Sequence, residues 1–111
     1  MRKVTKKQFV VCKEYKDNVI DVVKGDVVLL QTAEFITDSD PTYTEYLDLC
    51  NLESSMTLEV VIFSYEDYMK MVQGSNNWNP KFSHPIDIRE LPALFHYAKI
   101  QPRNITIEFD D

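Results

Sequence analysis

The sequence predicts one α+β domain over residues 1–111, with a mostly antiparallel sheet of four to five strands and about three short helices. Three observations support this. The chain has 111 residues and 44% apolar content, enough for the core of one ordinary domain. Its first third is rich in Val and Ile, which favour strands. The later segments alternate between helical and strand spacing, an order typical of an antiparallel sheet with helices on one face.

The first third contains three predicted strands. They are residues 8–15 (QFVVCKEY), 18–23 (NVIDVV) and 26–36 (DVVLLQTAEFI). Gly25 separates the last two, and a glycine flanked by polar residues predicts a hairpin that joins them. Lysines lie just before, within and just after the first of these strands. This composition is typical of an edge strand, where charged side chains prevent pairing with other chains.

Residues 36–48 (ITDSDPTYTEYLD) contain four acidic side chains and no basic one. Asp40 before Pro41 is a favourable N-cap, and Thr42 with Glu45 fits a capping box, so two helix starts remain open. Apolar residues then recur at the spacing of one helix face: Tyr43, Tyr46, Leu47 and Cys50. Part of the acidity is therefore explained by the start of a helix.

The second half of the chain completes the predicted order. Residues 57–63 (TLEVVIF) form a central strand, because most residues on both of its faces are apolar. Ser64 begins a short helix that ends near Gly74. The remaining predicted elements are a loop at 75–85, a helix at 91–99 with Pro92 in its first turn, and a strand at 104–109.

Charge is segregated along the chain. Between Lys24 and Lys70 there are 45 residues without Lys or Arg, and ten of them are acidic. Such a segment predicts a negative face that attracts a basic protein and repels nucleic acid. The alternative is a solvated surface that keeps a small protein soluble, although such surfaces usually mix both signs.

Several kinds of chemistry lack their sequence patterns. With two glycines, the chain cannot form a Walker loop or a dinucleotide-binding loop. A calcium loop that starts at Asp38 fails at Tyr43 and Leu49, where glycine and glutamate are required. His84 and His96 are the only histidines, and no zinc spacing occurs. We therefore predict no catalytic residue, no metal site and no cofactor.

The loop around Trp78 is a second candidate site, because Trp is frequent at interface hot spots and Phe82 lies close by. The alternative is that Trp78 folds back to close the core.

We expect a non-enzymatic, acidic binding protein that docks on a larger protein with a basic surface and inhibits it. A nucleic-acid-handling enzyme is a candidate partner, since clustered carboxylates can stand where phosphates would lie. The predicted partner-binding residues are Glu34, Asp38, Asp40, Tyr43, Glu45, Asp48, Trp78 and Phe82. Small inhibitors of this type are often viral or phage proteins.

Three other functions stay open. The first is a structural subunit that forms a homo-oligomer. The second is a nucleic-acid binder that uses the basic residues of the first strand, which the net charge of −6 disfavours. The third is a hydrolase that depends on His84 or His96. No apolar segment has the length of a signal peptide or a membrane span, so we expect a cytoplasmic protein, in the host cytoplasm if it is viral.

Overall fold

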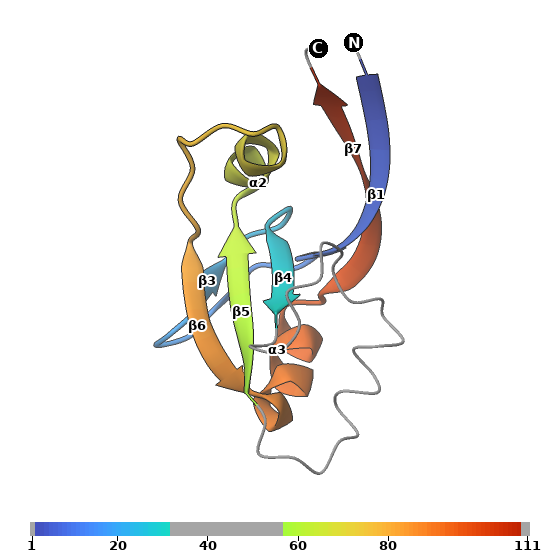
Figure 1. The fold of residues 1–111 in the computed structure, drawn as a ribbon. Coiled ribbons are helices and arrows are strands. Elements are labelled where there is room, and N and C mark those ends of the chain that lie inside the picture. Colours follow the sequence, from blue (N-terminus) through green and yellow to red (C-terminus); the bar gives the residue numbers. More distant parts are fainter. Residues whose placement is uncertain (1, 32–56, 110–111) are drawn as a thin grey trace.

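The computed structural model describes residues 2–31 and 57–109 (Figure 1). The elements are β1 (Arg2–Val10), β2 (Tyr15–Lys16), β3 (Asp21–Val22), β4 (Val27–Gln31), β5 (Thr57–Phe63), α2 (Tyr65–Val72), β6 (Phe82–Asp87), the 3-10 turn η1 (Ile88–Glu90), α3 (Leu91–Tyr97) and β7 (Gln101–Phe109). Five strands form one sheet in the order β6-β5-β4-β1-β7, and β2 pairs with β3. Every pairing is antiparallel, so the predicted α+β class is confirmed.

The described residues contain two α-helices rather than about three. The helix predicted from residues 36–48 falls outside the described residues. Within the described ranges, no helix has the length and apolar character needed to cross a membrane.

The two helices pack on opposite faces of the sheet, which corrects the prediction that helices cover one face. Alternate residues of a strand point to opposite faces, and in β4 and β5 both sets are apolar. One core joins α3 to Val28, Leu30, Val60 and Ile62. The other core joins α2 to Val27, Leu29, Val61 and Phe63. The continuous apolar run of β5 is therefore explained by burial on both sides, as predicted for a central strand.

β1 and β7 form a long ribbon that continues past the rest of the sheet (Figure 1). They pair from Arg2↔Phe109 to Val10↔Gln101, whereas β1 meets β4 only at Phe9 and Val10. The strand predicted at 8–15 therefore begins and ends too late. The first residues of β1 are mostly polar but still form a strand. They pair with β7, whose Ile105 and Ile107 are buried and give the ribbon one apolar face.

The predicted hairpin across Gly25 has the right turn but the wrong strand partners. Gly25 adopts a φ of 98°, and the Asp26 N–H donates to the Val23 carbonyl at 3.1 Å. β3 nevertheless pairs back with β2, while β4 pairs with β1 and β5. The hairpin loop lies instead between β2 and β3, where Asp17 Oδ1 accepts the N–H groups of Val19 and Ile20 at 2.7 Å each.

The predicted caps of α2 are confirmed. The Asp67 N–H donates to Ser64 Oγ at 3.1 Å, and Gly74 follows the helix with a φ of 87°. Tyr68 is buried and its hydroxyl accepts the Gln8 side-chain amide at 2.9 Å, which fixes α2 to β1. Tyr65, the first residue of α2, is 49% exposed.

The segment predicted as a loop at 75–85 contains the start of β6. A proline such as Pro85 is unfavourable in a central strand, because it has no N–H to donate. β6 lies at the edge of the sheet, where this missing donor is tolerated. The third predicted helix is confirmed as α3, with Pro92 in its first turn and an end at Tyr97. The last strand, predicted at 104–109, begins earlier, at Gln101, and Pro102 lies within it opposite Phe9.

Candidate functional site

Six of the eight predicted partner-binding residues lie outside the described residues. They are Glu34, Asp38, Asp40, Tyr43, Glu45 and Asp48. The structure places the other two, Trp78 and Phe82, on different faces of the sheet. These two aromatic residues therefore do not belong to one continuous site.

Trp78 packs against the α2 side of the sheet. Its ring meets the Phe63 ring edge to face, with centroids 5.5 Å apart. It is partly buried and contacts the core that contains Tyr68. This packing matches the alternative in which Trp78 folds back to close the core, and it leaves one part of the side chain at the surface.

Phe82 packs against the α3 side of the sheet. It is partly buried, and its ring meets His84 edge to face at 5.1 Å. Both residues lie on β6 two positions apart, so they share one face of the strand. Phe82 and His84 both line a groove on this side of the sheet.

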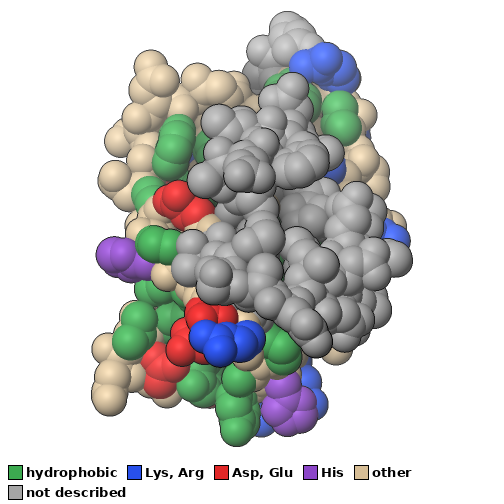
Figure 2. All heavy atoms as spheres, turned by 60° about the horizontal axis from the view of Figure 1, so that its bottom comes forward, with side chains coloured by type: hydrophobic (Ala, Val, Ile, Leu, Met, Phe, Trp, Pro, Cys, Tyr) green, Lys and Arg blue, Asp and Glu red, His purple; other side chains and the backbone are tan. Residues whose placement is uncertain are grey.

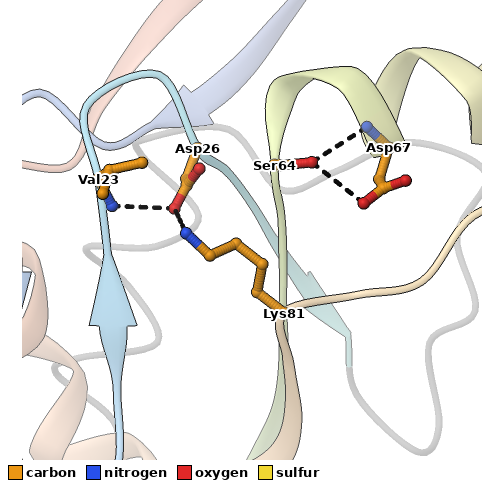
Figure 3. A network of polar contacts seen from close by, with 5 residues as sticks. All are labelled: Val23, Asp26, Ser64, Asp67 and Lys81. Carbon is orange, nitrogen blue, oxygen red and sulfur yellow. Dashed lines mark hydrogen bonds and ion pairs between the residues drawn. The ribbon is translucent and has the colours of Figure 1, made fainter.

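Asp26 is acidic but is not part of the surface. Its carboxylate is 3% exposed and accepts Lys81 Nζ at 2.7 Å and the Val23 N–H at 3.0 Å (Figure 3). A buried carboxylate needs such partners, because an unpaired buried charge is strongly destabilising. Lys81 thus connects the start of β6 to the turn before β4 and neutralises one of the ten acids.

Three other acids of the segment between Lys24 and Lys70 are described. Asp67 accepts the Ser64 hydroxyl at 3.1 Å, beside the helix cap (Figure 3). Glu66 lies 3.4 Å from Lys70 one turn along α2, and Glu59 accepts the Ser83 hydroxyl at 3.1 Å. These groups have local structural roles: Glu66 and Asp67 lie on α2, and Glu59 lies on β5.

A groove lies between β2, β6 and α3, with a volume of about 420 Å³. We call it the aromatic groove. The described residues that line it are Tyr15, Asp17, Val19, Ile20, Phe82, His84, Pro85, Ile86, Glu90, Ala93, Leu94 and Tyr97. The Tyr15 and Tyr97 rings stack with centroids 5.7 Å apart and an angle of 11°. This stack joins the β2–β3 hairpin to the end of α3.

The hydrogen bonds of Asp17 organise the hairpin side of the groove. Its Oδ2 accepts the Tyr15 hydroxyl at 2.9 Å, while its Oδ1 accepts two backbone N–H groups. These backbone bonds, together with the Tyr15 hydroxyl, lower the pKa of Asp17 below its ordinary value. The same hydrogen bond raises the pKa of Tyr15, because the neutral phenol is its donor. Asp17 is therefore a fixed negative charge at the groove.

Glu90 is the second carboxylate of the groove. It stands at the start of α3, is exposed, and makes no side-chain capping bond. The nearby Arg89 is already paired, since its guanidinium donates to both oxygens of Asp87 at 3.1 and 2.7 Å. Among the described lining residues none is Lys or Arg. Figure 2 shows hydrophobic and acidic side chains on this end of the molecule, with a basic side chain against the acidic ones.

His84 and His96 lie on different elements, β6 and α3, and Ser83 does not face His84. Ser83 and His84 are successive strand residues, so they point to opposite faces, and the Ser83 hydroxyl donates to Glu59. His96 is exposed and its ring meets that of Tyr97. In the described part of the chain, no group of three or more His, Cys, Asp or Glu side chains is arranged to hold a metal ion.

Most of the aromatic groove could not be predicted from the sequence, because Tyr15 and Tyr97 are 82 positions apart and meet only in the fold. One local signal was present. Asp17 followed by Asn18 is a turn signal between apolar segments, and it predicts the β2–β3 hairpin better than Gly25 does.

Comparisons with protein-family models, with curated proteins and with solved structures gave no match.

Proposed function

We propose that this chain is a non-enzymatic binding protein that docks on a larger protein with a basic surface and inhibits it. The carboxylate-rich segment that includes Glu34 to Asp48 supplies the electrostatic attraction. A nucleic-acid-handling protein is the proposed target class, because such proteins carry basic surfaces shaped for phosphates. A viral or phage origin and a cytoplasmic location belong to the same proposal.

The observation that carries the proposal is the separation of charge. β1 carries four basic residues, Arg2, Lys3, Lys6 and Lys7, and Lys3 lies 3.4 Å from Glu108 of β7. The 45 positions without Lys or Arg follow in the chain. A segment rich in carboxylates is attracted by the field of a basic partner, and this attraction orients the chain as it approaches.

The test is a pull-down from the native cell type or its host at about 0.1 M and about 0.5 M salt, which brackets weak and strong screening. The test variant changes Glu34, Asp38, Asp40, Glu45 and Asp48 to the corresponding amides. The control variant makes the same change at five exposed acids outside residues 34–48: Glu14, Asp21, Glu59, Glu66 and Glu108. Both variants carry the same net charge.

A partner that is lost at high salt and in the test variant, but kept by the control variant, supports a docking face. Equal loss in both variants contradicts it, because net charge would then explain the attraction. A partner that is indifferent to salt and to both variants also contradicts it.

One observation favours a second function, a homo-oligomer. Val19 is 71% exposed and Tyr97 is 56% exposed, and both line the aromatic groove. Apolar side chains exposed together at one groove offer a surface that a second copy of the chain can cover. Light scattering separates the two functions, since an apolar self-contact survives high salt and an acidic docking face does not.

A further inference from the structure

We infer that the aromatic groove binds a segment of the partner in which an apolar side chain stands next to Lys or Arg. The inference rests on the proposed function and names a second contact for it. It concerns described residues alone, whereas the acidic docking face lies in another part of the chain.

The shape of the groove suits one or two large side chains. Phe82, Ile86 and Leu94 form its inner wall, and all three pack in or against the core that contains α3. The wall is therefore held in place before a partner arrives, which lowers the entropic cost of binding. An apolar side chain that enters here covers surface that now faces water.

The charge of the groove selects the neighbours of that apolar side chain. Asp17 and Glu90 are exposed carboxylates, and none of the described lining residues is Lys or Arg. Arg89 attracts Glu90 electrostatically, but its guanidinium is hydrogen-bonded to Asp87. Asp17 stays ionised because three hydrogen bonds favour its charged form. The Tyr97 ring is 56% exposed, and an aromatic face attracts Lys and Arg. A basic side chain therefore finds two carboxylates and one ring.

The edge strand decides against a different mode of binding. β6 is at the edge of the sheet, so an extended segment could in principle pair with it. Pro85 has no N–H to offer such a strand, and it lies in the middle of β6. Pro85 therefore disfavours pairing along this edge, and we assign recognition in the groove to side chains.

The experiment is an NMR titration of the full 15N-labelled chain with three synthetic peptides, at concentrations up to about 1 mM, the weak end of the affinity scale. The first peptide has twelve residues, with two Leu flanked by four Arg in a Ser/Gly background. The second has Glu in place of Arg. The third has Ser in place of Leu.

We expect shifts from the first peptide at the groove residues, with Ala93 and Tyr97 among them, and much smaller shifts from the other two. The absence of shifts from the first peptide would overturn the inference. Shifts centred on the ribbon or on α2 would also overturn it, as would equal shifts from the Ser-containing peptide, because plain charge attraction needs no groove.

Two variants keep the test specific. Ala93 is exposed on α3, so Ala93→Arg leaves the core intact while it fills the groove and repels the basic peptide; we expect affinity to fall at least about tenfold. Glu90→Gln should weaken binding about two- to fivefold, as for an exposed ion pair. Glu66→Gln, on the other face, should leave it unchanged. Unaltered affinity in Ala93→Arg overturns the inference.

The pull-down distinguishes failure of this inference from failure of the proposed function. If the partner is lost in the variant of residues 34–48 but retained by Ala93→Arg, the docking face stands and the groove contact is overturned. The first peptide could bind in the groove while the partner binds equally well to the variant of residues 34–48 and at high salt. That result would contradict the acidic docking face and would leave the groove as a peptide-binding site independent of it.

Discussion

Removal of Lys81 should destabilise the fold more than removal of its partner Asp26. Lys81→Met leaves the Asp26 carboxylate, which is 3% exposed, with the Val23 N–H as its remaining hydrogen-bond donor in Figure 3. Loss of one member of a buried ion pair costs about 3–5 kcal/mol. We expect the lower end, about 3 kcal/mol, because the Lys81 side chain is 31% exposed and the pair is therefore partly solvated.

Asp26→Asn should cost about 1 kcal/mol, since the amide oxygen still accepts the Val23 N–H and Lys81 can turn to water. The double variant should cost less than the sum of the two, with a coupling energy of at least about 1.5 kcal/mol. Urea unfolding at neutral pH measures all four proteins, and unchanged m-values validate the comparison. Equal costs for the two single variants, or strict additivity in the double variant, would refute the reasoning.

Three further predictions concern other contacts. Tyr68→Phe removes the acceptor of the buried Gln8 amide and should cost about 1–3 kcal/mol in urea unfolding, while Gln8→Met with Tyr68→Phe should cost less than that single change. The guanidinium and backbone N–H of Arg89 hold the pKa of Asp87 at about 2, so Arg89→Gln should raise it toward its ordinary 3.8 in a carboxyl NMR titration. Because that pKa is lowered by folding, the contribution of Asp87 to stability is present above about pH 4 and is lost as pH falls through about 2. Trp78→Ala should cost about 1–2 kcal/mol, as expected for a partly buried ring, and should leave peptide binding in the aromatic groove unchanged.

Local signals in the sequence predicted the elements whose cause is local. The Ser64 cap, the Gly74 end and the alternation of Ile105, Ile107 and Phe109 each depend on neighbours within a few residues. The apolar run of β5 likewise reported burial on both sides. These predictions hold because hydrogen bonding and side-chain alternation act over one turn or one strand.

Strand partners could not be predicted in the same way. The turn at Gly25 predicts a reversal of the chain, but the choice between β2 and β4 as partner of β3 depends on which apolar faces meet in the core. The sequence at the start of β1 is mostly polar and does not by itself predict a strand. Its strand partner, β7, lies about one hundred residues later in the chain and supplies the buried neighbours. Long-range pairing overrides local composition in both places.

The candidate site was the least predictable part. Charge segregation is visible in sequence, yet burial turned Asp26 into an internal group with its own lysine. Trp78 and Phe82, four positions apart, face opposite sides of the sheet. The aromatic groove is lined by Tyr15, Phe82 and Tyr97, which come from three separate elements. No single sequence motif therefore predicts it.

The β1–β7 ribbon also determines how the molecule would respond to a pulling force. Arg2 and Phe109 face each other at its end, where both chain ends emerge together (Figure 1). Tension applied between those ends would open the ribbon one pair at a time, from Arg2↔Phe109 toward Val10↔Gln101, instead of shearing all nine pairs at once. The chain would therefore yield at low force along this zipper before any load reached the two cores.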